Sequence, residues 1–133
     1  MTKKIQVEKM AVKLAMEYEL SQGRTPKDVS GDKNYIGYDI ISGNLEIEVK
    51  GRSKDKRPFC LLNENNIMGL EMANDSNYRL YVIMNPLDNP KLIIFNKQDV
   101  LNIKSERRQW EIPLRRKNYE GGISLISLIK SKK

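Results

Sequence analysis

The chain of 133 residues is long enough for one domain with its own hydrophobic core, and its 39% hydrophobic and 31% charged residues are typical of a folded protein. Its formal charge is +7, with no histidine and a single cysteine, Cys60. This composition excludes Ser-His and Cys-His nucleophile pairs, His-containing zinc sites and multi-cysteine zinc ribbons within the chain, and leaves carboxylates, lysine and an oxygen-preferring metal for catalysis.

The first predicted element is a helix over residues 4–21, because apolar side chains recur there at spacings of three and four residues. Gly23 is a natural stop for it, and residues 25–30 favour a short strand. Glu8 falls on the apolar stripe of this helix, and Glu19 lies further along much the same side. Each glutamate either points into a site or lies at the edge of the stripe with its carboxylate in water, which is the commoner arrangement.

The segment 35–50 predicts a β-hairpin, since its two halves alternate in polarity on either side of a short turn. A two-residue turn at Gly43 and Asn44 pairs Ser42 with Leu45 and so sets the register of both strands. A three-residue turn would shift that register by one residue.

In this register Asp39 lies directly opposite Glu48, with Cβ atoms about 4.5–5.5 Å apart. Alternation along the strand puts Lys50 on the same face as Glu48. Opposed like charges destabilise a hairpin by about 0.2–1 kcal/mol, so a cation between the carboxylates explains them better than stability does. The alternative is that these side chains form only the solvated face of the hairpin. The other face is suited to a core and consists of Tyr38, Ile40, Leu45, Ile47 and Val49.

The remaining elements alternate between strands and helices, which predicts an α/β fold with a mixed central sheet flanked by helices. Asn63 is a suitable N-cap for a helix from about 64 to 73. The apolar segment 78–84 predicts a buried strand. The other predicted elements are strands at 58–62 and 92–95, a helical turn at 98–103, a strand at 110–114 and a last strand or helix at 123–129.

Basic residues are unevenly distributed along the chain. Residues 1–96 carry 14 basic and 13 acidic side chains, whereas residues 97–133 carry 10 and 4. Such a distribution attracts a polyanion through phosphate neutralisation, although it also suits a solvated surface that keeps a protein soluble. The candidate nucleic-acid contacts are Arg52, Lys54, Lys56, Arg57, Arg107, Arg108, Arg115, Arg116 and Lys117.

Several short motifs follow one another in order along residues 5–95. They are Glu8 within a helix, Asp28-Val29-Ser30, Gly37-Tyr38-Asp39-Ile40, Ile47-Glu48-Val49-Lys50-Gly51, Asn63-Glu64 and Tyr78-Arg79-Leu80-Tyr81-Val82. In this order they resemble the NO VEIN C-terminal-like domain family, a branch of the PD-(D/E)xK, or restriction-endonuclease-like, nuclease superfamily. The resemblance implies one nuclease-like domain over residues 1–133, with an αβββαβ core at about 5–95 and a basic extension at about 96–133.

The resemblance also implies a role for each site residue. Asp39 and Glu48 would bind Mg²⁺ or Mn²⁺ directly, together with the backbone carbonyl of Val49. Lys50 would orient the attacking water or stabilise charge on the phosphate. Glu8 would match the helix glutamate that assists the metal, often through water, and so completes the expected catalytic set.

The expected function is metal-dependent hydrolysis of phosphodiester bonds in nucleic acid, DNA more than RNA, in a defence, restriction or repair setting. A helicase or defence-system partner and a homodimer would suit that function, while no membrane contact is expected and the lone cysteine favours the cytoplasm. The first alternative is a catalytically silent module of the same fold that binds nucleic acid, with Trp110 and Tyr119 as stacking surfaces or, for Trp110, core packing. The second is a protein-docking domain.

Overall fold

The computed structural model describes residues 2–53, 59–103, 110–114 and 121–130. Predictions on the basic residues Lys54, Lys56, Arg57, Arg107, Arg108, Arg115, Arg116 and Lys117, and on Tyr119, lie outside these residues. The side chains of Cys60 and Trp110 are not described either, although each residue belongs to a strand. In the described part of the chain, no helix combines the length and apolarity needed to span a membrane.

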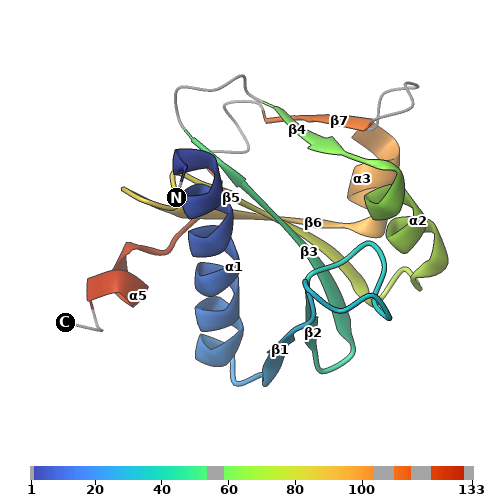
Figure 1. Cartoon of the computed structure of the whole chain (residues 1–133), viewed down its shortest axis with the longest axis horizontal. Coiled ribbons are helices and arrows are strands. Elements are labelled where there is room, and N and C mark those ends of the chain that lie inside the picture. The colour runs from blue at the N-terminus through green and yellow to red at the C-terminus, as the bar shows by residue number, and fades with distance from the viewer. Residues whose placement is uncertain (1, 54–58, 104–109, 115–120, 131–133) are drawn as a thin grey trace.

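The elements follow the predicted order closely (Figure 1). The helices are α1 (Lys3–Ser21), α2 (Glu64–Met72), α3 (Lys97–Ile103) and α5 (Ile126–Lys130). The strands are β1 (Pro26–Asp28), β2 (Ile40–Ser42), β3 (Leu45–Arg52), β4 (Phe59–Leu62), β5 (Tyr78–Met84), β6 (Lys91–Asn96), β7 (Trp110–Pro113) and β8 (Ile123–Ser124). The last segment, predicted as either a strand or a helix, contains both.

Six of the strands form one mixed sheet in the order β1-β2-β3-β5-β6-β8. Only β3 and β5 pair in parallel among the described strands, as expected for strands joined by a crossover that includes a helix. β4 and β7 form a separate two-stranded antiparallel sheet. The predicted α/β class, with a mixed sheet and flanking helices, is therefore confirmed.

Helices cover both faces of the six-stranded sheet (Figure 1). β5 serves both faces because its side chains alternate, with Leu80 and Val82 in the core beneath α2 and α3. Its Tyr81 and Ile83 lie in the core beneath α1 and α5. The strand is buried on both sides, which explains its continuous apolar sequence.

The hairpin forms in the predicted register, with Ser42 opposite Leu45 and Ile40 opposite Ile47. Gly43 has a φ of +59°, a conformation that glycine adopts without steric cost at the first central position of a hairpin turn. β2 is only three residues long, whereas β3 continues to Arg52. The second half of β3 therefore has no hairpin partner along the edge that faces away from β5.

Candidate active site

The ladder between β2 and β3 ends at the pair of Ile40 with Ile47, so Asp39 does not form the predicted pair with Glu48. Its backbone N–H donates to the carbonyl of Ile47 at 2.8 Å, and its own carbonyl accepts from Val29 N at 2.8 Å. The prediction that Asp39 lies directly opposite Glu48 in the ladder is thus wrong in detail, because the N–H of Asp39 turns back to the carbonyl of Ile47, which already faces Ile40. The pairing of β2 with β3 ends at Ile40.

Beyond the end of the backbone pairing, the side-chain carboxylate of Asp39 forms the next hydrogen bond to β3. Its Oδ2 accepts a hydrogen bond from Val49 N at 2.9 Å, in the place of a carbonyl of a longer β2. The N–H and C=O of one strand residue point to the same edge, so the carbonyl of Val49 also faces this edge. The carboxylate of Asp39 and the carbonyl of Val49 consequently lie on the same side of β3.

Glu48 is buried, with 4% of its surface exposed, on the face of β3 that looks toward α2. Burial raises its pKa well above the usual value, and the neighbouring Asp39 carboxyl raises it further, while the ammonium of Lys50 acts in the opposite direction. The carboxyl groups of Asp39 and Glu48 are therefore close enough to influence each other, even though their backbones do not pair.

One donor holds the carboxylate of Glu48 in place. Asn66 Nδ2 donates to Glu48 Oε2 at 2.7 Å, and Asn66 is itself buried. The other end of the same amide, Asn66 Oδ1, accepts from Asn63 N at 3.1 Å, while Asn63 Oδ1 accepts from Asn66 N at 2.9 Å. This reciprocal capping box at the start of α2 fixes the side chain that holds Glu48.

Asn63 was identifiable as the cap from the sequence, whereas the role of Asn66 was missed. The signal was available, because a capping box needs a hydrogen-bonding side chain three residues after the N-cap. What the sequence alone did not show was that the second end of the amide reaches Glu48.

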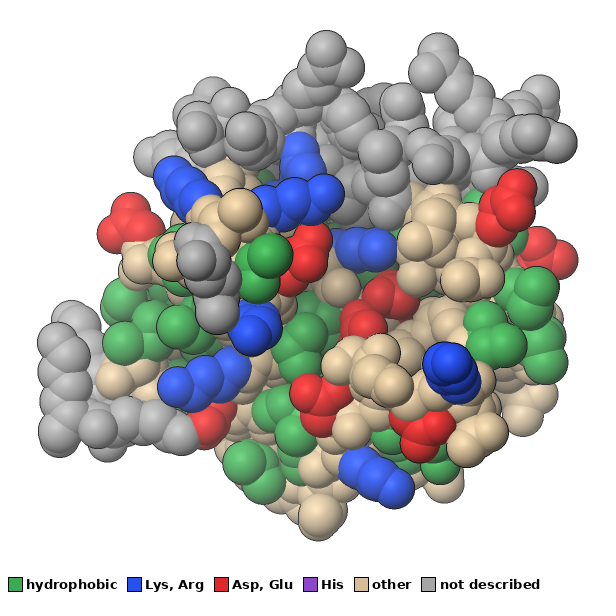
Figure 2. Space-filling view, in the orientation of Figure 1, with side chains coloured by type: hydrophobic (Ala, Val, Ile, Leu, Met, Phe, Trp, Pro, Cys, Tyr) green, Lys and Arg blue, Asp and Glu red, His purple; other side chains and the backbone are tan. Residues whose placement is uncertain are grey.

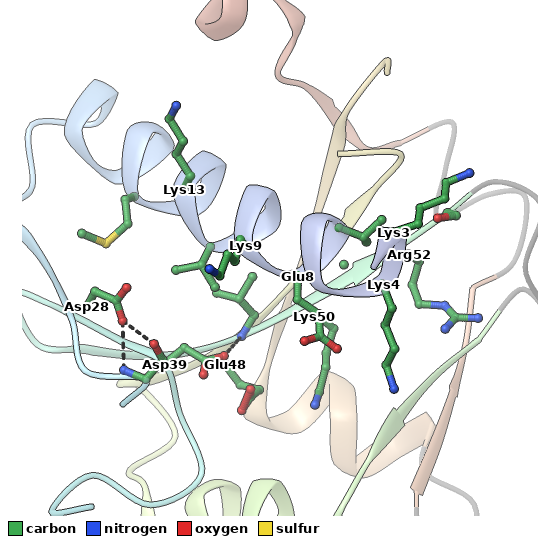
Figure 3. Close-up of a pocket in the computed structure, with 17 residues that line it drawn as sticks. Lys3, Lys4, Glu8, Lys9, Lys13, Asp28, Asp39, Glu48, Lys50 and Arg52 are labelled. Atoms are coloured by element: carbon green, nitrogen blue, oxygen red, sulfur yellow. Dashed lines mark hydrogen bonds between the residues drawn. The ribbon is translucent and has the colours of Figure 1, made fainter. Parts of the chain in front are cut away.

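These groups line one open cavity of about 1070 Å³ beside α1, at the unpaired edge of β3 (Figure 3). Asp39, Glu48 and Lys50 all contribute to its lining, as does Glu8 from α1. In the space-filling view, Lys and Arg side chains surround acidic side chains at a hollow on this face of the molecule (Figure 2). The structure thus brings together all four side chains of the predicted catalytic set, together with Val49 and Arg52.

Small residues let α1 approach β3 closely beside the cavity. A Cβ atom on Gly51 would lie 3.0 Å from the Cβ of Ala11 and 3.0 Å from Val7 Cγ1. This close packing places Glu8, one residue after Val7, in the wall opposite Lys50 (Figure 3). Glu8 is exposed, in keeping with one of the two arrangements that the helix pattern allowed.

Glu19 is buried, so the expected arrangement with its carboxylate in water is wrong for this residue. Its side chain is fully buried and accepts hydrogen bonds from Arg24 Nε at 2.5 Å and from Tyr81 OH at 2.6 Å. Burial alone would raise the pKa of Glu19, but the hydrogen bonds from Arg24 and Tyr81 outweigh it and lower that pKa. Glu19 is therefore a structural acid that ties α1 to β5, outside the cavity.

The candidate metal centre consists of the carboxylates of Asp39 and Glu48 and the backbone carbonyl of Val49. All of these ligands are oxygen atoms, which suits Mg²⁺ or Mn²⁺ rather than a soft metal. Within the described residues, no group of three or more Asp, Glu or Cys side chains is arranged to hold a metal ion. The centre offers two mutually influencing carboxylates and one backbone carbonyl, and Mg²⁺ in proteins is commonly bound by one or two carboxylates with water and substrate phosphate. The residues present therefore fit such an ion.

Comparisons with known proteins show the family and the fold of the chain. The family model described as "Protein NO VEIN, C-terminal" matches residues 7–95, which include every residue of the centre. A search of solved structures matched Hjc, a Holliday junction resolvase of the archaeal hyperthermophile Archaeoglobus fulgidus, at a TM-score of 0.59 and 18% identity. That match covers 92% of this chain and 95% of Hjc, and it shows that the chain has an Hjc-like restriction-endonuclease fold. A comparison with curated proteins found no match.

Proposed function

The chain belongs to the family described as Protein NO VEIN, C-terminal, and on that premise we propose that it is a metal-dependent nuclease with its active centre at Asp39, Glu48 and Lys50. One observation carries the proposal. Two carboxyl groups lie close together at the unpaired edge of β3, one of them buried, in a cavity lined by lysines. Burying a carboxylate beside another acid destabilises a fold, so this arrangement is best explained by a bound cation.

Each residue has a distinct part in the proposed reaction. Asp39 and Glu48 would hold Mg²⁺ or Mn²⁺ together with the carbonyl of Val49. The bound ion would supply Lewis acidity, which lowers the pKa of a water molecule and offsets charge on the phosphate. Asn66 keeps one oxygen of Glu48 in place by its hydrogen bond. The ammonium of Lys50, two residues along the same strand, would stabilise the charge that develops on the attacked phosphodiester.

DNA is the substrate that we favour over RNA. The support is the fold shared with Hjc, whose name as a Holliday junction resolvase specifies a DNA substrate. Arg52 lies at the end of β3 and lines the cavity, where it would contact the backbone next to the cleaved bond. The remaining arginines and lysines predicted from the sequence, and a helicase, defence-system or second-copy partner, stay predictions.

The test compares two glutamates of the same strand. Glu48→Gln should lose Mn²⁺ binding in calorimetry and Mn²⁺-dependent cleavage of mixed single-stranded, duplex and branched DNA. Glu46→Gln is the matched control, because Glu46 lies two residues earlier on β3, outside the cavity lining. Equal cleavage by both variants would show that the centre is wrongly assigned. DNA binding that survives EDTA, with no cleavage by the parent under Mn²⁺, would instead select the silent binding module.

A further inference from the structure

The outer wall of the cavity is formed by lysines that belong to α1. Four lysines of this helix line the cavity, and all of them are exposed or partly exposed. Lys50 and Arg52 line the same cavity from β3 (Figure 3). The four are Lys3, Lys4, Lys9 and Lys13.

Some of these lysines lie at positions that destabilise the helix. Lys3 and Lys4 lie in the first turn, where the helix dipole disfavours positive charge by about 0.3–1 kcal/mol per residue. Lys9 and Lys13 are four residues apart, a spacing at which like charges destabilise a helix by about 0.2–0.5 kcal/mol. Among the ion pairs of the described residues, none involves any of the four lysines. Their positive charge is therefore not paired within the described part of the protein.

The spacing of the lysines suits a nucleic-acid backbone. Lys9 and Lys13 lie one turn apart on the same side of α1, about 6 Å along a helix that rises about 1.5 Å per residue. One strand of duplex DNA carries a phosphate about every 3.4 Å of axis, so this length matches roughly two phosphates. Lysine binds phosphate as a flexible point charge and needs no fixed geometry.

Other polyanionic partners fit this surface less well. A helix that binds a membrane surface must offer an exposed apolar face, but the apolar residues Val7, Ala11 and Leu14 of α1 are buried in the protein. An acidic peptide would bring carboxylates toward Asp39 and Glu48, which lie in the same cavity. A phosphodiester instead provides the phosphate ligands with which Mg²⁺ is usually bound.

We propose that the lysines of α1 bind the phosphate backbone of the substrate, so that the nucleic acid lies along α1 and the unpaired edge of β3 with its cleaved phosphate at Asp39 and Glu48. This inference rests on the proposed nuclease function for the identity of the substrate. It adds a binding surface that lies within the first helix and is separate from the basic residues after Lys50. The contact is to phosphates, and it therefore carries no sequence preference.

The test uses charge removal on two matched pairs of lysines. The double variant Lys9→Gln/Lys13→Gln changes the proposed surface, while Lys27→Gln/Lys33→Gln removes two exposed lysines that do not line the cavity. Binding of a fluorescent DNA duplex of about 20 base pairs is measured in EDTA between about 50 and 200 mM salt. The first variant should bind at least about tenfold more weakly at the low-salt end, and its slope of log affinity against log salt should be smaller by about 2. The control should keep the parent's slope.

Two outcomes would overturn the proposed surface. The first is an equal change of slope in both double variants, and the second is competition by poly-glutamate or anionic vesicles at the same charge concentration as DNA. Cleavage is measured separately, with Mn²⁺. Cleavage by the parent together with an unchanged slope for Lys9→Gln/Lys13→Gln would reject the surface and keep the nuclease. The expected slope change for Lys9→Gln/Lys13→Gln, without cleavage by the parent, would keep the binding surface and reject the nuclease.

Discussion

The carboxylate of Asp39 accepts a hydrogen bond from the backbone N–H of Val49, with Oδ2 2.9 Å from N. Asp39 therefore does two things at once: it satisfies a backbone donor at the edge of β3, and it presents negative charge beside Glu48. These two roles can be separated by experiment, since an amide oxygen can replace the acceptor but not the charge.

Asp39→Asn should keep the fold and lose the proposed chemistry. We expect its free energy of unfolding to stay within about 0.5 kcal/mol of the parent's, because an acceptor for Val49 N–H remains. Mn²⁺ affinity, measured by calorimetry, should fall at least about tenfold. Asp39→Ala should show the same loss and should also be destabilised by about 1–3 kcal/mol, because it leaves the N–H without its partner. Full cleavage by Asp39→Asn would be incompatible with a metal ligand at this position.

Asn66→Ala should weaken metal binding more than its effect on stability explains. The variant removes both half of the capping box and the donor to Glu48. Loss of a side chain that orients a metal ligand typically costs about 10–100-fold in affinity. Asn63→Ala is the control, since it breaks the same cap without touching Glu48 and should reduce stability by a similar amount, about 0.5–2 kcal/mol. Equal Mn²⁺ affinities for the two variants would assign Asn66 to the helix cap alone.

Glu19→Gln should destabilise the protein at neutral pH and lose most of that effect in acid. The pKa of Glu19 is lowered in the folded state from its ordinary value of 4.5. The ionised form is thus favoured by folding, and its contribution is complete above about pH 4.5 and lost as the pH falls through the lower folded value. Urea unfolding at pH 7 should show a loss of about 1–3 kcal/mol. Glu71→Gln, at an exposed position of α2, should show no such pH-dependent difference.

Gly69→Ala should disturb the loop that carries Asp39. A Cβ atom on Gly69 would lie 2.8 Å from the Cα of Gly37, where the loop before Asp39 crosses α2. Overpacking of this kind costs about 1–3 kcal/mol, and we expect a matching loss in urea unfolding together with weaker Mn²⁺ binding. Gly31→Ala is the control, because a Cβ atom there would meet nothing within 4 Å among the described residues, and the change should alter stability by less than about 0.5 kcal/mol. A parent-like Gly69→Ala would mean that the crossing is not close-packed.

The sequence alone determined the elements whose causes are local. The two-residue turn at Gly43 and Asn44 sets the pairing of Ser42 with Leu45, and alternation along β3 then separates Glu48 and Lys50 from the apolar face. The cap at Asn63 and the apolar run of β5 also depend only on neighbouring residues. These features predict that the carboxylates and the lysine of the centre share one face of the hairpin, without any knowledge of the rest of the chain.

Only the tertiary structure decided which contacts these residues make. The N–H of Asp39 leaves the register and donates to the carbonyl of Ile47, while the carbonyl of Asp39 is held by Val29, directly after β1. Glu19 is buried because Tyr81, 62 residues away along the chain, meets it across the fold. The same holds for Asn66 at Glu48 and for the lysines of α1 along the cavity. Contacts between distant segments depend on how whole elements pack, and periodicity within one element carries no information about its neighbours in space.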